Sequence, residues 1–119
     1  MSNDPKNSFT EVTDENFEKK VLNNSLPVIV IFERNFSGAA HIMKLILKKI
    51  NNDYGSRVEI YRYNMDKNLA ASNCYRVRNG MAVLVFYNSR VVSNTGVISS
   101  DALKNIIDAI IRDTDYHKN

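Results

Sequence analysis

The run LPVIVIF at residues 26–32 restricts the fold more than any other segment of the chain. It is apolar and rich in β-branched residues, and it lacks the polar alternation of a strand that has one face in water. Runs of this kind are typical of strands buried on both faces, which lie at the centre of a sheet covered by helices on both sides. We therefore expect a central strand here, in an α/β domain.

The neighbouring segments alternate between strand and helix patterns. Strand patterns occur at 8–12, 57–65, 81–87 and 90–96, and helix patterns at about 13–22, 37–52, 66–74 and 99–112. The order β-α-β-α-β-α-β-β-α predicts a mixed sheet of about five strands flanked by four helices. The predicted domain spans 8–112, with a disordered segment at 1–7 and a flexible tail at 113–119, because both ends are polar and lack periodicity.

Side-chain spacing predicts which faces of the helices are buried and how the helices begin. The longest helix is expected to bury a stripe made of Ile42, Leu45, Ile46 and Ile50. The last helix has its stripe at Leu103, Ile106, Ile107, Ile110 and Ile111. The expected caps are Thr13 or Asp14 for the first helix, Asp66 for the third, and Ser99 or Ser100 for the last.

Composition excludes several function classes. The 16 basic and 13 acidic residues leave a formal charge of +3, without the dense basic stripe of a nucleic-acid-binding protein. No apolar run reaches the ~18 residues of a membrane span, and the start lacks the pattern of a secretory signal, so we expect a cytoplasmic protein. One cysteine and two separated histidines predict no internal disulfide, no metal and no other cofactor.

Three phrases of the sequence resemble the thioredoxin family. They are VTDENFEKKVL at 12–22, LPVIVIF at 26–32 and YRVRNGMAVLVFYNSRVV at 75–92. In that family the central strand leads to a W-C-G-P-C box that opens the next helix. The corresponding residues here are Phe36, Ser37, Gly38, Ala39 and Ala40. The resemblance implies a thioredoxin fold with a degenerate redox motif at Ser37-Gly38-Ala39-Ala40.

The chemistry of the family's box requires two sulfur atoms. A thiolate at the helix N-terminus attacks a substrate disulfide, and a second thiol resolves the mixed disulfide. Ser37 offers an alcohol that is barely ionised at neutral pH, and Ala40 has no functional group. We therefore expect no catalytic residue here and no dithiol–disulfide oxidoreductase activity, which makes the protein a redox-inactive family member.

Other positions also depart from the family pattern. Ile31 stands where the family has a buried Asp, and Met81 where it has a cis-Pro, so we expect a trans peptide between Gly80 and Met81. Arg62 stands at the family's Lys position. A buried guanidinium without a partner is costly, so we expect Arg62 to reach solvent or to pair with an acidic neighbour such as Glu33.

These departures predict a protein-binding adaptor or chaperone that works through the groove of the former active site. The resemblance implies that the groove consists of Arg34, Phe36, Ser37, His41, Arg78 and Met81, with Arg76 and Val77 nearby. Its basic rim favours acidic partners, and a protein partner is expected rather than nucleic acid or membrane. The alternative for the groove is an ordinary mixed surface.

Three smaller hypotheses concern single features. Ser37 and His41 are either a nucleophile and its base or, as we expect, a helix cap and a solvated residue. The amides of Gly38 to Ala40 are candidates for holding an anion. Cys74 is either inert or the single thiol of a thiol–disulfide oxidoreductase-related enzyme, which is the alternative to the adaptor.

Overall fold

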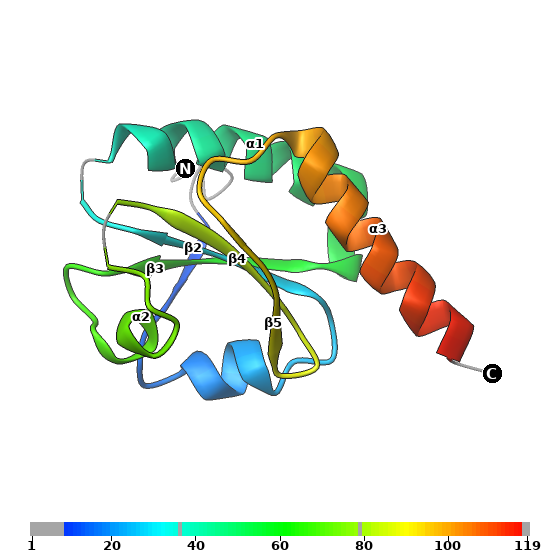
Figure 1. The fold of residues 1–119 in the computed structure, drawn as a ribbon, viewed down its shortest axis with the longest axis horizontal. Coiled ribbons are helices and arrows are strands. Elements are labelled where there is room, and N and C mark those ends of the chain that lie inside the picture. Colours follow the sequence, from blue (N-terminus) through cyan, green and yellow to red (C-terminus); the bar gives the residue numbers. More distant parts are fainter. Residues whose placement is uncertain (1–8, 36, 79, 118–119) are drawn as a thin grey trace, which may run out of the picture.

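A five-stranded mixed sheet forms the centre of the protein (Figure 1). The computed structural model describes residues 9–35, 37–78 and 80–117, with side chains as far as residue 113, so the predicted segment 1–7 lies outside it. The strands are β1 (Thr10–Val12), β2 (Val28–Glu33), β3 (Glu59–Asn64), β4 (Ala82–Tyr87) and β5 (Arg90–Thr95). Their order is β1-β3-β2-β4-β5, with β1, β3 and β2 parallel and β4 and β5 antiparallel, so the predicted sheet is confirmed.

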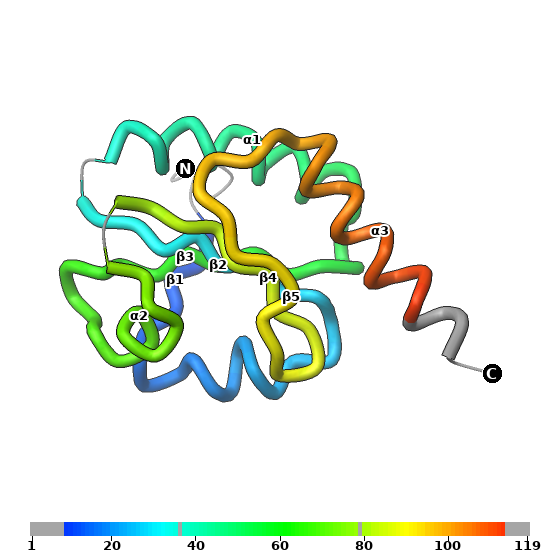
Figure 2. The backbone as a smooth tube through the Cα atoms, in the orientation of Figure 1, coloured from blue at the N-terminus to red at the C-terminus, as the bar shows by residue number. Residues whose placement is uncertain are grey.

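Helices cover both faces of this sheet. They are η2 (Glu18–Leu22), α1 (Gly38–Tyr54), α2 (Ala70–Cys74) and α3 (Ser100–His117), with a 3₁₀ turn, η3 (Gly55–Arg57), after α1. The backbone trace shows α1 and α3 on one face and η2 and α2 on the other (Figure 2). The helix η2 is a π-helix, and α3 continues past the predicted domain end at 112. None of the helices within the described residues is long and apolar enough to cross a membrane.

Strand β2 is buried along its whole length, as its sequence predicts. Its side chains alternate between two core clusters. Ile29 and Ile31 belong to the cluster with α1 and α3, whereas Val30 and Phe32 belong to the cluster with η2. The strand therefore fixes both helical layers, and its carboxyl end leads directly to the start of α1.

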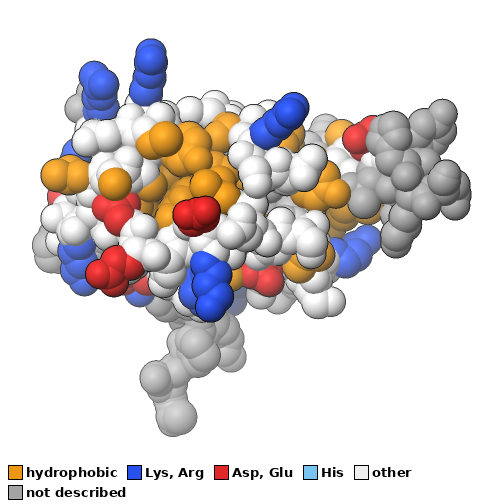
Figure 3. Space-filling model, turned by 90° about the horizontal axis from the view of Figure 1, so that it is seen from below, with side chains coloured by type: hydrophobic (Ala, Val, Ile, Leu, Met, Phe, Trp, Pro, Cys, Tyr) orange, Lys and Arg blue, Asp and Glu red, His pale blue; other side chains and the backbone are white. Residues whose placement is uncertain are grey.

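The second cluster is dominated by aromatic rings. Phe17 has its ring centroid 5.6–6.2 Å from those of Phe32, Tyr63, Tyr75 and Phe86. Leu22, Tyr61 and Tyr75 are only partly buried at the margin of this cluster. Seen from below, the molecule shows hydrophobic side chains gathered at the middle of this face (Figure 3).

The buried stripe of α1 differs from the predicted one. The side chains of Ile42 and Leu45 are 54% and 59% exposed, whereas Met43 and Leu47 are fully buried. Only Ile50 of the predicted set is buried, and Ile46 packs partly against the cluster. The prediction was wrong because the sequence offers two overlapping apolar stripes on this helix, and only the contact with the sheet selects between them.

The caps of the short helices also differ from the predicted ones. Asp14 does not cap the helix that follows it; its carboxylate accepts hydrogen bonds from the amides of Leu69, Ala70 and Ala71, at the start of α2. Asp66 does not cap α2 either; its carboxylate accepts hydrogen bonds from the Asn35 amide and the Arg34 guanidinium. The cap of α3 is Ser99, whose Oγ accepts from the amide of Ala102. The sequence prediction assumed that Asp14 caps the helix next to it in the chain, whereas in the fold its hydrogen-bond donors belong to a helix far along the chain.

Candidate functional site

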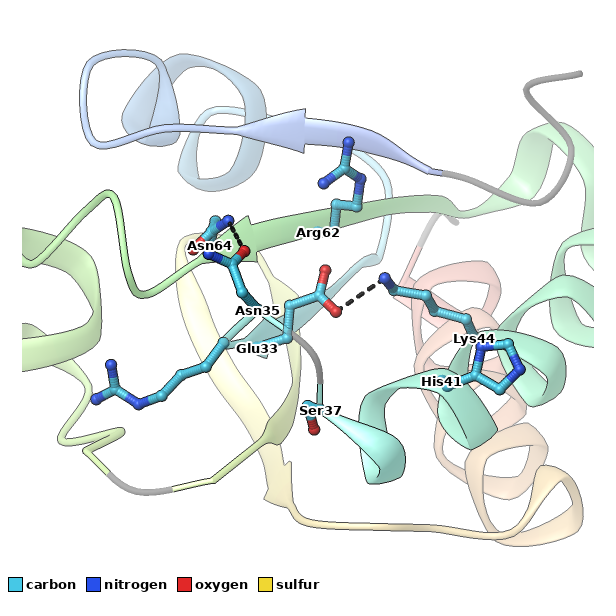
Figure 4. A pocket seen from close by; sticks show the side chains of 8 residues that line it. Glu33, Asn35, Ser37, His41, Lys44, Arg62 and Asn64 are labelled. Atoms are coloured by element: carbon cyan, nitrogen blue, oxygen red, sulfur yellow. Dashed lines mark hydrogen bonds and ion pairs between the residues drawn. The ribbon is translucent and has the colours of Figure 1, made fainter. Parts of the chain in front are cut away.

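The carboxyl ends of β2 and β3 meet the first turns of α1 around a polar hollow of about 320 Å³ (Figure 4). Its lining residues are Glu33, Arg34 and Asn35 after or at the end of β2, Ser37, His41 and Lys44 at the start of α1, and Arg62 and Asn64 on β3. Parallel strands place their carboxyl ends at one edge of the sheet, which is why these polar residues converge. We call this cavity the polar hollow.

A buried carboxylate lies at the centre of the polar hollow. Glu33 is only 7% exposed, and its Oε1 lies 2.8 Å from Nζ of Lys44 on α1. Figure 4 shows the two side chains pointing toward each other. Because a buried charge needs a compensating partner, Lys44 is what allows an ionised Glu33 at this depth.

Ser37 is the N-cap of α1, as predicted. Its Oγ accepts a hydrogen bond from the amide of Ala40 at 3.1 Å. The side chain of His41 is exposed, and among the described residues no hydrogen bond joins its imidazole to the hydroxyl of Ser37. Because the Ala40 amide donates to this cap, only the amides of Gly38 and Ala39 remain from the three that were predicted to hold an anion. The arrangement is that of a helix start and gives no nucleophile–base pair.

Arg62 pairs with an acidic neighbour, as predicted, but that neighbour is Glu11 and not Glu33. It pairs with Glu11 on β1 at 3.3 Å, and its Nε donates to the carbonyl oxygen of Phe9 at 2.8 Å. Glu33, the expected partner, is held by Lys44. The pairing between β1 and β3 places Glu11 directly beside Arg62, and this register is not visible in the sequence.

Arg34 joins three loops at the edge of the polar hollow. Its Nη1 lies 3.0 Å from Oδ1 of Asp66, and its Nη2 donates to the carbonyl oxygen of Arg78 at 2.9 Å. The hydrogen bond from the Asn35 amide, followed by the bond from Arg34, holds the pKa of Asp66 below its ordinary value. Asp66 therefore stays ionised under physiological conditions and keeps the three loops together.

A second hollow of about 460 Å³, which we call the loop hollow, has Arg78 in its lining. It is lined by Arg76, Val77, Arg78, Met81, Ala82, Asn94, Thr95 and Gly96. The predicted groove is thus divided. Arg34, Ser37 and His41 line the polar hollow, whereas Arg78 and Met81 line the loop hollow.

Two further predictions concern this loop. Phe36, one of the residues predicted to form the groove, lies outside the described residues. The peptide bond between Gly80 and Met81 is trans, as expected, since the described chain contains no cis bond.

Cys74 is exposed and is the last residue of α2. It lines neither hollow, but only Tyr75 separates it from Arg76, the first residue of the loop hollow. Two residues span at most about 7 Å of chain, so the thiol lies close to that hollow.

Arg76 adopts a left-handed backbone conformation, with φ at 61°. This conformation costs a residue with a Cβ atom about 1–2 kcal/mol, and glycine avoids that cost. We expect Arg76→Gly to raise the free energy of unfolding by about 0.5–1 kcal/mol, because relief of this cost outweighs the opposing effect of glycine's greater entropy in the unfolded chain. Urea denaturation measures the change. Arg78→Gly is the control, since Arg78 lacks a positive φ, and there glycine should lower stability. Equal losses in both variants would contradict the prediction.

Sequence reasoning missed Glu33, Asn35, Lys44 and Asn64 as members of the site. A signal for Glu33 was present: it ends an apolar strand and shares the face of Ile31 by strand alternation. Lys44 lies outside the apolar stripe predicted for its helix, and its ion pair with Glu33 is visible only in three dimensions. Asn35 and Asn64 bond to each other across the ends of two strands, which requires the strand order to be known.

Comparison with known proteins places this geometry in a family. The family model described as Thioredoxin matches residues 8–109. The chain is 32% identical over 107 residues to the thioredoxin of Buchnera aphidicola subsp. Schizaphis graminum, covering 89% of this chain and 99% of that protein. It is 31% identical over 103 residues to the thioredoxin of Buchnera aphidicola subsp. Acyrthosiphon pisum, covering 86% and 95%. The chain therefore belongs to the thioredoxin family, and its fold is the thioredoxin fold.

The relatives correct the predicted function. An adaptor or chaperone without redox activity was expected, but the relatives that match nearly the whole chain are named thioredoxin, including thioredoxin 1 of Synechococcus elongatus at 28% identity. That name points to thiol–disulfide chemistry, so the prediction of an adaptor or chaperone was wrong. It relied on the loss of sulfur at Ser37 and Ala40 and on the departures at Ile31 and Met81, and these changes at one site do not define the function of the protein.

Proposed function

We propose that the protein carries out thiol–disulfide exchange with polypeptide substrates in the cytoplasm, and that Cys74 supplies the sulfur. The names of the relatives support the reaction class. The observation that carries the assignment is the place of the only thiol in the sequence, which is exposed and directly precedes the lining of the loop hollow.

The exchange needs one thiolate of the protein and one outside thiol. The Cys74 sulfur attacks one sulfur of a substrate disulfide, so that a bond between Cys74 and the substrate forms while the original S–S bond breaks. The other substrate sulfur leaves as a thiolate and takes up the proton that Cys74 gave up. A second thiol, from the substrate or from a small reductant of the cytoplasm, then attacks the mixed disulfide and restores Cys74.

The loop hollow supplies contacts for the polypeptide. Val77, Met81 and Ala82 give it apolar side chains, and methionine adapts to different partners. The guanidinium groups of Arg76 and Arg78 have no hydrogen bond or ion pair with a described residue, so they are available to acidic groups of a substrate. A substrate held here brings its disulfide near Cys74, which is how binding accelerates the exchange.

Exchange rates with insulin, a polypeptide that contains disulfides, test this function. The comparison uses the full chain and a peptide of residues 70–78, which carries the same thiol without the fold. We expect the full chain to form the mixed disulfide about tenfold faster than the peptide, and Cys74→Ser to form none. Ser37→Ala is the matched control and should react like the wild type. A full chain that reacts no faster than the peptide would rule out the proposed function.

The contribution of the loop hollow is tested separately. Arg78→Gln should slow the reaction with insulin, and Arg90→Gln, which removes the same charge at the far end of β5, should leave it unchanged. Equal rates in these two variants would show that the hollow does not contact the substrate.

A further inference from the structure

The polar hollow contains a buried carboxylate that is only half satisfied. Oε1 of Glu33 is paired with Lys44, but no hydrogen bond or ion pair from a described residue reaches Oε2. Glu33 is only 7% exposed, and its carboxylate points toward Lys44, whereas the guanidinium of Arg62, which also lines the cavity, extends toward β1 (Figure 4). A buried carboxylate accepts several hydrogen bonds when fully satisfied, so this oxygen is a vacant acceptor.

Unused donors lie around the same cavity. Lys44 has three N–H donors and uses one on Glu33, and Arg62 uses Nε and Nη1 but not Nη2. His41 adds an exposed ring to the lining. Lys44 and Arg62 line the hollow from α1 and β3, so donors from two elements and the vacant acceptor of Glu33 all belong to its lining.

The charges of the lining select the kind of ligand. A simple anion bound to Lys44 and Arg62 would lie against the Glu33 carboxylate, and a simple cation bound to Glu33 would lie against Lys44 and Arg62. Like charges at such short range are unfavourable at a partly buried site. A molecule with an ammonium and a carboxylate on neighbouring atoms meets both signs at once through charge-assisted hydrogen bonds.

We propose that the polar hollow binds a small zwitterion of the α-amino-acid type, with its ammonium on Glu33 and its carboxylate on Lys44 and Arg62. The volume of about 320 Å³ is at the lower end of small-molecule sites, and it accommodates a ligand of this class. This site is separate from the proposed thiol chemistry, because Cys74 does not line it. A substitution at Cys74 leaves it intact.

Three matched probes test the proposal on the full chain. L-alanine carries both charges, ethylamine lacks its carboxylate, and propionate lacks its ammonium. Each is titrated while the backbone amide signals of Asn35, Lys44 and Arg62 are followed by NMR. We expect saturable shifts with L-alanine in the millimolar range, which is reasonable for so small a molecule, and no saturation with the other two. Equal responses to L-alanine and propionate, or no saturation with any probe, would overturn the proposal.

Substitutions at Glu33 test whether its carboxylate binds the ammonium group of the ligand. Glu33→Gln should weaken binding of L-alanine about tenfold and strengthen binding of propionate, because Lys44 then lacks its internal partner. This reversal of preference distinguishes recognition from a loss of folding, and the spread of the same amide spectrum reports the fold. Glu18→Gln removes one exposed acidic group on η2 and should change neither affinity. Unchanged preference in Glu33→Gln would also count against the site.

Discussion

Phe17→Ala should lower the free energy of unfolding by about 3–5 kcal/mol, the range for deleting a buried aromatic ring. Phe17 is 5% exposed and packs against four other rings, two of them edge to face, Tyr63 and Phe86. Its loss leaves a cavity between η2 and the sheet that the remaining rigid rings cannot fill. Domains of this size are stable by only about 5–15 kcal/mol, so the variant loses a large share of its stability.

Urea denaturation followed by tyrosine fluorescence measures this loss. Phe17→Leu is the control, since it keeps most of the volume and removes the ring contacts, and we expect it to cost about 1–2 kcal/mol. A loss below 1 kcal/mol for Phe17→Ala, roughly that of an average point mutation, would mean that the ring cluster does not hold η2 to the sheet.

Asp14→Ala should lower the free energy of unfolding by about 2–4 kcal/mol near neutral pH. The carboxylate accepts from three amides at the start of α2 and from the Tyr63 hydroxyl at 2.7 Å. Alanine leaves these donors without their acceptor, and the hydroxyl belongs to a fully buried side chain. Urea denaturation compares this variant with Asp14→Asn, which keeps one acceptor oxygen and should lose less.

The same contact predicts an acid-sensitive contribution to stability. Burial raises the pKa of Asp14, but the hydrogen bonds from Tyr63 and from the amides of α2 outweigh it, and the pKa is lowered overall. A lowered pKa in the folded state stabilises the protein above the unfolded value of about 3.9, and this contribution disappears as the pH falls through the folded value. Stability of the wild type should therefore fall more steeply in acid than that of Asp14→Asn. Parallel curves would contradict this assignment.

Much of the fold followed from patterns in the sequence. The unbroken apolar runs of β2 and β4 predicted the central strands, since burial of a strand depends mainly on its own residues. The strand patterns at 81–87 and 90–96 leave only Asn88 and Ser89 between them, and both residues have positive φ, as the tight turn of a hairpin requires. Contacts between distant segments were not predictable, and these determine the buried stripe of α1 and the cap of α2.

The candidate site was predicted only in part, for a related reason. Ser37 was correctly placed as a cap because capping depends on neighbouring residues. Glu33 and Lys44 lie eleven positions apart and meet only because the first turns of α1 pass beside the end of β2. The register between β1 and β3 likewise decides that Arg62 pairs with Glu11. Periodicity carries no information on such register or on packing between elements.

Arg34 makes the loops at one edge of the sheet open together. It bonds to Asp66 and to the Arg78 carbonyl, and Asp66 also accepts from the Asn35 amide. Each of these bonds lies at the surface, but releasing any one of the three loops requires breaking its bonds to the other loops. Hydrogen exchange at the amides around Asn35 and Asp66 should consequently proceed through one shared opening event, so that this edge behaves as a single cooperative unit. In a protein built in this way, the walls of the two hollows loosen together.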